Sequence, residues 1–360
     1  MRLPGYRTLR LAWAAVFALL AGGVGTLAWL GPLPEPPAAA APDPAPDPSP
    51  VAAPPAVVAA APSPTAPTPP ASSPAAIAVP EPPAPTGPTV IAPPEPALLE
   101  ASRHGMVPRL GPENRTSIRA YARPFDRSDT RARIGIVINN IGLNGQFSED
   151  AIRSLPGGVT LAFSPYAARP EPLQDRARAR GMEMLVALPL EPHGFGQSAD
   201  PGPQALLTGL SLAENLDRLD WALSRIQGQV GAIGGLGSMR GERFAANGEL
   251  LASVQQALTQ RGLLYVDPRP AAPQPERAFG RAIDLLLDEP SAVRPEVERQ
   301  LAALEALARQ QRSAVGLANN PTPSVVAAIA AWSAGLEERG AVVVPITVLI
   351  RAPSDQAGRQ

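Results

Sequence analysis

The chain has no cysteine and no lysine, and only two of its 360 residues are histidine, His104 and His193. The absence of cysteine excludes disulfide bonds, thiolate catalysis and zinc sites with sulfur ligands. All 31 basic residues are arginines, and 32 acidic residues bring the net charge to -1. Because this balance produces no overall attraction to a polyanion, we expect no nucleic-acid partner.

One long uncharged stretch lies near the N-terminus. Residues 11–30 read LAWAAVFALLAGGVGTLAWL, about the length that a helix needs to cross a bilayer. The only charged residues before it are basic: Arg2, Arg7 and Arg10. This excess of positive charge predicts that residues 1–31 are a cytoplasmic stub and a single-pass anchor in the inner membrane, with the rest of the chain in the periplasm. A cleaved signal peptide is the alternative, and it would export the same domain.

Residues 32–121 are predicted to be a disordered linker followed by a junction. The segment from Gly31 to Glu100 holds 25 of the 47 prolines, mixed mainly with Ala, Ser, Thr and Val. Such a composition buries too little apolar surface to offset the entropy of ordering, so we expect an extended tether. The junction, residues 101–133, is rich in arginine. Because acidic residues interrupt it, we favour a solvated lead-in over a lipid- or glycan-binding strip.

The remaining sequence alternates strand-like and helix-like patterns. Eight short apolar runs lie at residues 134–138, 159–163, 184–188, 230–233, 263–266, 283–287, 314–317 and 342–346. Helical spacings of apolar residues occur at 211–226, 248–261, 291–311 and 324–339. This alternation predicts an α/β domain over residues 122–351, with a parallel sheet or barrel, and a tail at 352–360. In either architecture, ligands bind at the carboxyl ends of the strands.

Short motifs follow the predicted strands in a fixed order: Ile138–Leu143 (INNIGL), Leu155–Gly157 (LPG), Val159–Tyr166 (VTLAFSPY), Leu188–Pro192 (LPLEP), Asp200–Pro203 (DPGP), Leu206–Ser211 (LLTGLS), then Asp267, Arg269, Asp284 and Asp288. This series resembles the divergent polysaccharide deacetylases of bacterial envelopes over roughly Ala122 to Val348. The resemblance implies a deformed (β/α) barrel. It also implies hydrolysis of acetamido groups on a sugar polymer with a divalent metal such as zinc.

The sequence departs from this family where the family places its catalytic groups. The family has two neighbouring carboxylates after the first strand and histidines in later loops. The matched positions here are Asn139, Asn140, Gly235, Asn320 and Thr322. An amide is neutral and a weak ligand for a transition metal, and glycine has no side chain. We therefore expect no catalytic residue by the family mechanism, no bound metal and no cofactor.

Seven polar residues near the predicted strand ends are candidates for binding a ligand: Asn139, Asn140, Glu191, His193, Asp267, Arg269 and Asp288. The asparagine pair either caps the strand-to-loop turn or also contacts sugar hydroxyls. Glu191 and His193 are either a replacement acid–base pair or ordinary loop residues. Asp267 and Arg269 either form a structural ion pair or bind sugar, and a carboxylate site for a hard cation is a further alternative.

Three functions from different classes follow from these features. The first is a pseudoenzyme that binds an envelope glycan or an envelope protein. The second is an active hydrolase with a rearranged site, for example Glu191, His193 and Asp267. The third is a structural envelope protein whose main feature is the tether. A fold alone does not determine a function, so we rank the three by the chemistry of the site. The absence of the catalytic base and of the metal ligands favours the pseudoenzyme.

Overall fold

The computed structural model describes residues 89–353. The predicted membrane span at 11–30, the proline-rich residues up to 88 and the tail from 354 lie outside this range. Between residues 89 and 353, no helix combines the length and the apolar character that crossing a membrane requires.

The chain order alternates strands and helices, as the sequence pattern predicts. The strands are β1 (Leu99–Ser102), β2 (Gly105–Pro108), β3 (Ala132–Ile141), β4 (Thr160–Phe163), β5 (Met184–Ala187), β6 (Gly231–Ile233), β7 (Leu264–Asp267), β8 (Gly280–Ala282), β9 (Leu285–Leu286), β10 (Ser313–Ala318) and β11 (Ala341–Val343). The α-helices are α2 (Ser117–Ala120), α3 (Gly145–Ser154), α4 (Glu171–Ala179), α5 (Leu212–Ser224), α6 (Glu242–Ala246), α7 (Gly248–Gln260), α8 (Arg294–Gln311) and α9 (Pro323–Ala334). Three short 3-10 helices are η1 (Pro96–Leu98), η2 (Pro112–Asn114) and η3 (Ile346–Val348).

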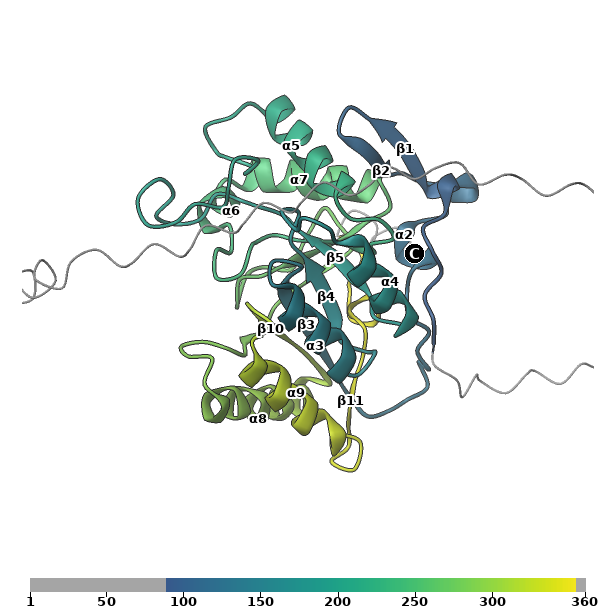
Figure 1. Cartoon of the computed structure of the whole chain (residues 1–360), viewed down its shortest axis with the longest axis vertical. Coiled ribbons are helices and arrows are strands. Elements are labelled where there is room, and N and C mark those ends of the chain that lie inside the picture. Colours follow the sequence, from purple (N-terminus) through teal and green to yellow (C-terminus); the bar gives the residue numbers. More distant parts are fainter. Residues whose placement is uncertain (1–88, 354–360) are drawn as a thin grey trace, which may run out of the picture. The chain divides into compact units, whose positions relative to one another are not determined.

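The main sheet is parallel and curled, with the strand order β8-β7-β6-β5-β4-β3-β10-β9 (Figure 1). The long strand β3 pairs with β10, and it also pairs with β11 at its start and with β4 at its end. The two end strands, β8 and β9, belong to one continuous segment, residues 280–287. In this segment Ile283 donates its N–H to Asp267 and Asp284 donates its N–H to Val315, so one segment bonds to both edges of the sheet. The predicted parallel sheet is confirmed, and its curl is that of a deformed barrel.

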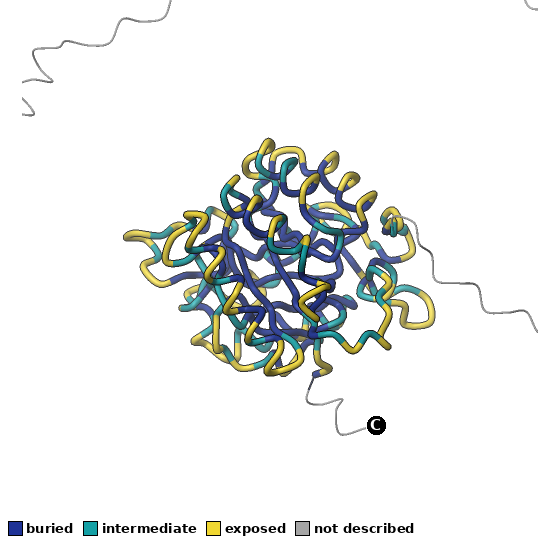
Figure 2. Tube along the Cα trace, turned by 90° about the horizontal axis from the view of Figure 1, so that it is seen from below, coloured by how far each residue is buried: buried dark blue, intermediate teal, exposed yellow. Residues whose placement is uncertain are grey.

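Side chains from alternate residues of the strands enter two different apolar clusters. Ile136 and Ile138 of β3 pack in a cluster that also holds helix residues, such as Leu219 of α5. Val137, between them, packs in a second cluster with Leu185 of β5. Among the described residues, the only α-helix residues that contact this cluster are Ile118 and Ala120 of the short α2. The first cluster therefore lies between the sheet and its helices, and the second fills the inside of the curl. Burial on both faces explains why the strands run through the buried centre of Figure 2.

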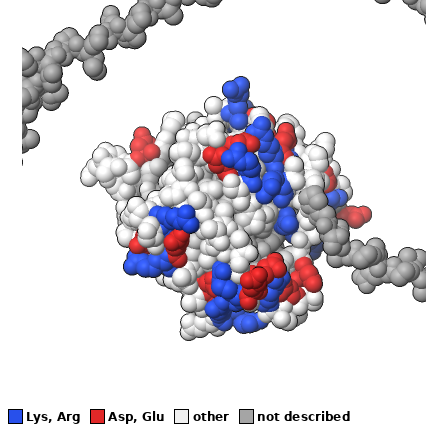
Figure 3. Space-filling model, turned by 60° about the horizontal axis from the view of Figure 1, so that its bottom comes forward, with Lys and Arg blue, Asp and Glu red and all other residues white. Residues whose placement is uncertain are grey.

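Local signals in the sequence fix several helix ends. Ser211 and Glu214 form a capping box at the start of α5, because each side chain binds the other residue's backbone N–H. Gly181 and Gly262 follow α4 and α7 with φ values of 67° and 72°, the left-handed conformation that commonly ends a helix. On the face drawn in Figure 3, most charged side chains form groups in which acidic residues lie next to basic ones, and one acidic group at the upper left stands apart.

Residues 89–121 are folded, whereas the sequence analysis placed them in the linker and junction. They form η1, the β1–β2 hairpin, η2 and α2, and the hairpin packs beside α5 (Figure 1). Ile91, Leu98 and Tyr121 of this segment are buried. Their apolar side chains are too widely spaced to produce a periodic pattern. The segment is ordered by contacts with distant residues, such as the hydrogen bond from the Ile91 N–H to the Arg178 carbonyl (3.0 Å).

Candidate functional site

Asn139 and Asn140 lie at the carboxyl end of β3, where its pairing with β4 shifts register between Ile138 and Ile141. Asn139 is fully buried, and its Nδ2 donates to the Gly235 carbonyl at 3.0 Å. Its Oδ1 accepts from the Asn140 N–H at 2.8 Å. Asn140 has φ 58°, a left-handed conformation that asparagine adopts more readily than most residues. The pair therefore caps the end of β3 and ties it to the loop after β6.

The loop after β10 joins this cluster. The Asn140 Nδ2 donates to Asn320 Oδ1 at 2.9 Å. Asp288 holds the same loop in place, because its carboxylate accepts the N–H groups of Asn319 (2.9 Å) and Asn320 (3.2 Å). Burial nevertheless raises the pKa of Asp288 above its ordinary value, and these donors only partly offset it. Thr322 lies at the start of α9, where its hydroxyl contacts that of Ser324 at 3.2 Å.

The loop after β6 folds tightly over the asparagines. Leu236 and Met239 exchange two backbone hydrogen bonds of 2.9 Å, and we call residues 236–239 the covering turn. A Cβ at Gly235 would lie 2.6 Å from the Met239 carbonyl oxygen, so the turn leaves no room for a side chain there. A Cβ at Gly237 would lie 2.5 Å from the Asn140 Nδ2, which places the turn directly against that amide.

Glu191 and His193 make separate contacts among the described residues. The buried Glu191 accepts from the Thr208 N–H (2.5 Å) and hydroxyl (2.6 Å), and its other oxygen is 3.0 Å from the Arg243 Nε. His193 is exposed, and its backbone N–H donates to Glu242 at 3.4 Å. Among residues 89–353 no hydrogen bond joins the Glu191 and His193 side chains. Glu191 thus joins the two ends of the long loop after β5 and links this loop to α6.

Asp267 and Arg269 form a bidentate ion pair at the end of β7. The Arg269 Nε and Nη2 donate to the two Asp267 oxygens at 2.9 and 2.7 Å, and the Arg269 N–H adds a third bond at 3.0 Å. These bonds raise the pKa of the Arg269 guanidinium. Asp267 is 2% exposed, so all the contacts that the structure gives its carboxylate are internal.

The residues at the matched positions do not fit the divalent metal that the family resemblance implies. Within residues 89–353, no three His, Cys, Asp or Glu side chains are placed to hold a metal ion. The groups that come together, Asn139, Asn140 and Asn320, offer neutral amides that bind one another and the backbone. The backbone of the covering turn fills the space that a side chain at Gly235 would need. We therefore derive no reaction step through a metal.

A cavity of about 290 Å³ opens beside this cluster. It is lined by Asn140, Leu143, Ser164, Tyr166, the Asp200–Pro203 segment, Leu236 and Met239. Gly202 packs on Tyr166, because a Cβ on Gly202 would lie 2.7 Å from the Tyr166 ring. A second cavity, of about 660 Å³, shares Asp200, Gly202 and Pro203 with the first and is also bordered by Phe195 and Arg218. The sequence candidates did not include Tyr166 or Leu143, although both lie in or beside motifs that marked strand ends.

Two buried acceptors at this end of the sheet have no donor. Within the described residues, the Oδ1 atoms of Asn140 and Asn319 have no hydrogen-bond partner. A buried amide oxygen without a donor costs free energy, on the order of 1–3 kcal/mol. A hydroxyl group of a ligand, or a water molecule, would satisfy these oxygens as a donor.

A curled parallel sheet covered by helices places the domain in the class of deformed (β/α) barrels. Residues 136–350 match the divergent polysaccharide deacetylase family, so the chain belongs to that family and the resemblance is confirmed. An uncharacterized protein from Haemophilus influenzae is 26% identical over 221 residues, which cover 59% of this chain and 74% of that protein. The crystal structure of an uncharacterized protein from Agrobacterium tumefaciens has 32% identity and a TM-score of 0.63, and the match covers 68% of this chain and 99% of that one.

Proposed function

We propose that this chain is a membrane-anchored member of the family that binds an envelope glycan at the carboxyl end of its sheet without hydrolysing it by the metal mechanism. Family membership implies a carbohydrate-related function. One observation carries the rest of the proposal. Metal hydrolysis needs carboxylate and imidazole ligands at these positions. Instead, the amide groups of Asn139 and Asn140 donate hydrogen bonds to the Gly235 carbonyl and to Asn320.

The surroundings of these amides support a glycan as the ligand. The cavity beside them combines apolar surface from Leu143 and Met239 with the Ser164 hydroxyl and the ring of Tyr166. Sugars present the matching chemistry, because they carry apolar ring faces and hydroxyl donors and acceptors. The buried Oδ1 of Asn140 lies at the same place and lacks a donor within the described residues.

The membrane arrangement is a second part of the proposal. The uncharged residues 11–30 and the arginines before them support a single-pass anchor in the inner membrane. The proline-rich residues 32–88 support a tether, and the folded domain would then lie in the periplasm. Protease digestion of intact and of permeabilised spheroplasts tests this orientation. Degradation of the domain in intact spheroplasts is expected, and protection there would contradict it.

A binding measurement tests the glycan. The probes are cell-wall sacculi, in a pull-down, and soluble oligomers of N-acetylglucosamine, in a titration of the purified full chain. Leu143 borders the cavity and is 56% exposed, so we expect Leu143→Glu to weaken binding about tenfold or more, which corresponds to about 1.4 kcal/mol. Leu212, which is 44% exposed on α5, provides the matched control Leu212→Glu. If no glycan is retained, a protein partner or a structural role becomes the better account.

A zinc titration of the full chain, with acetate release as a second readout, tests the absence of metal hydrolysis. We expect no stoichiometric tight binding and no acetate release. The alternative of a rearranged hydrolase makes its own prediction, because Glu191→Ala and Asp267→Ala would then abolish acetate release. We rank this alternative second, since Glu191 and Asp267 are both engaged in internal ion pairs.

A further inference from the structure

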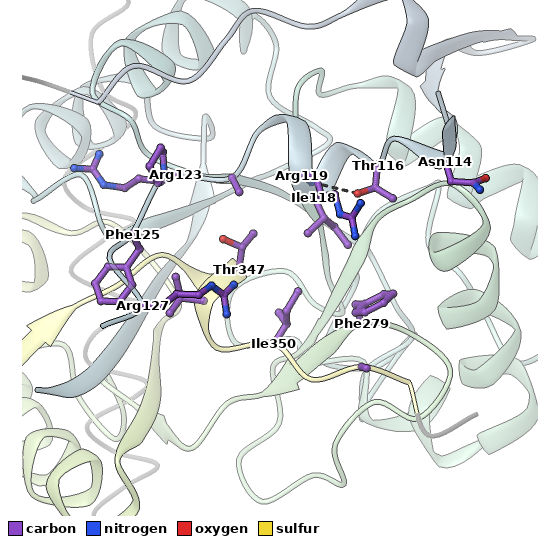
Figure 4. Close-up of a pocket in the computed structure, with 14 residues that line it drawn as sticks. Asn114, Thr116, Ile118, Arg119, Arg123, Phe125, Arg127, Phe279, Thr347 and Ile350 are labelled. Carbon is purple, nitrogen blue, oxygen red and sulfur yellow. Dashed lines mark hydrogen bonds between the residues drawn. The ribbon is translucent and has the colours of Figure 1, made fainter. Parts of the chain in front are cut away.

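A large cavity lies at the opposite end of the sheet, where the strands begin. Its volume is about 660 Å³, and it is enclosed by two segments that are far apart in sequence, residues 114–127 and residues 347–352. Phe279, immediately before β8, closes one side (Figure 4). None of the residues that line this cavity belongs to the candidate glycan site.

The lining of this cavity is both apolar and basic. Its larger apolar side chains are Ile118, Phe125, Phe279, Val348 and Ile350. Its only charged side chains are Arg119, Arg123 and Arg127. The guanidinium groups of Arg119 and Arg127 approach the middle of the cavity from opposite sides (Figure 4). An anionic group that binds between these two guanidiniums would leave the apolar surface of the cavity free to contact a hydrocarbon chain of the same ligand.

A second cavity, of about 400 Å³, adjoins the first and shares Arg127 and Val348 with it. Five further arginines line it: Arg131, Arg133, Arg281, Arg312 and Arg351. Asp129 is the only carboxylate in the lining of either cavity. The two cavities together therefore form a strongly basic region, which we call the arginine basin.

Most of these arginines have no acidic partner. Arg131 pairs with Asp129 and Glu337, and Arg281 pairs with Asp284. For the other six, no carboxylate of the described residues lies within 4.0 Å: Arg119, Arg123, Arg127, Arg133, Arg312 and Arg351. Three of the six donate to backbone carbonyls, namely Arg123, Arg133 and Arg312. Burial also lowers the pKa of Arg123, as expected for a cation that is partly removed from water without full compensation.

We propose that the arginine basin binds an anionic phospholipid, with its phosphate between Arg119 and Arg127 and an acyl chain along the apolar wall. Guanidinium groups bind phosphate oxygens with paired, charge-assisted hydrogen bonds. Each methylene that enters the apolar part of the cavity contributes about 0.8 kcal/mol. The uncompensated charge selects an anion, and the apolar wall selects an amphiphile over free phosphate or a hydrophilic anionic glycan.

The path of the chain agrees with a lipid ligand. A Cβ on Gly181 would lie 2.0 Å from the Thr89 carbonyl oxygen and 2.3 Å from the Arg123 Nη1, so the described chain begins beside the arginine basin. Thr89, the first described residue, thus lies at this end of the domain. The site itself does not require the anchor, because all its residues belong to the folded domain.

Short-chain lipids test the proposal on the purified full chain in a neutral detergent. The probes are dihexanoyl phosphatidylglycerol, dihexanoyl phosphatidylcholine and inorganic phosphate, each titrated by calorimetry. We expect the phosphatidylglycerol to bind at least about tenfold more tightly than either of the others, a difference of about 1.4 kcal/mol. If phosphatidylcholine bound as tightly as phosphatidylglycerol, the charge would not contribute to binding. If inorganic phosphate bound as tightly, the apolar wall would not contribute. Either result overturns the proposal, and neither depends on a variant.

A matched pair of variants locates the site. Arg119→Gln combined with Arg127→Gln removes the two guanidiniums that enter the cavity, and we expect a loss of about tenfold or more in affinity for phosphatidylglycerol. Arg109→Gln combined with Arg169→Gln removes the same charge from arginines that line neither cavity, and should leave the affinity unchanged. Equal losses in the two double variants would overturn the assignment. If the first double variant does not fold, Arg119→Gln alone replaces it, since Arg119 is exposed.

Discussion

Glu183 should make the stability of the domain depend on pH. This residue directly precedes β5 and is completely buried. Its carboxylate accepts hydrogen bonds from the Arg123 N–H (2.9 Å), the Thr347 N–H (3.1 Å) and the Thr347 hydroxyl (2.5 Å). Burial nevertheless outweighs these donors and raises the pKa of Glu183 from 4.5 to about 7.

The size and sign of the effect follow from this shift. Below pH 4.5 the carboxyl group is protonated in both the folded and the unfolded chain. Between pH 4.5 and about 7 the unfolded chain releases the proton and the folded chain retains it, so the free energy of unfolding falls as the pH rises. A shift from 4.5 to about 7, at ~1.4 kcal/mol per pKa unit, corresponds to a loss of about 3 kcal/mol. Above about pH 7 the contribution of Glu183 no longer changes.

The variant Glu183→Gln isolates this contribution, because glutamine is neutral at every pH of the experiment. Urea unfolding, followed by tryptophan fluorescence, is measured at a series of pH values from 4.5 to 8 for the unaltered chain and the variant. The difference between the two free energies of unfolding should change by about 3 kcal/mol over this range, in favour of the variant at high pH. Glu338→Gln, at an exposed glutamate, should run parallel to the unaltered chain. Parallel curves for Glu183→Gln would refute the reasoning.

Three other substitutions should lower stability by different mechanisms, each measured from urea midpoints. Gly235→Ala forces a Cβ to within 2.6 Å of the Met239 carbonyl oxygen and should cost about 1–3 kcal/mol; no loss would show that the covering turn yields easily. Asp284→Ala leaves Arg281, which is 4% exposed, without its carboxylate partner, and should lower the free energy of unfolding by about 3–5 kcal/mol. A loss below about 1 kcal/mol would contradict the idea that Arg281 is buried as a charged group. Ser211→Ala removes the cap of α5 and should cost about 1 kcal/mol, an effect that Ser211→Asp should largely avoid.

The sequence predicted the main sheet well because its strands are buried on both faces and therefore read as continuous apolar runs. Each of the eight predicted runs overlaps a strand of the structure. β8 was missed, since Gly280–Ala282 has no apolar pattern and is a strand only through its pairing with β7. The β1–β2 hairpin was missed for a similar reason, because distant contacts rather than local periodicity order it.

The candidate site was predicted in part. The positions matched to the family, Asn139, Asn140, Gly235 and Asn320, lie together, since each is at or just after the carboxyl end of a strand in one parallel sheet. The same reasoning could not find the arginine basin. The basin combines residues 114–133, Phe279, Arg281, Arg312, Ser313 and residues 347–352, which are far apart in sequence and meet only after the chain has folded. A run of arginines in a sequence does not indicate whether folding will bring carboxylates close enough to pair with them.

The segment 280–287 has a consequence for how the domain resists misassembly. Open sheets end in strands whose free backbone groups recruit other chains, and proteins guard such edges with charges or bulges. Here both terminal strands of the curled sheet belong to the same short stretch of chain, which bonds to β7 on one side and to β10 on the other. One segment thus covers the free backbone groups of both β7 and β10, and a change that displaced this segment would expose both edges to other chains at once.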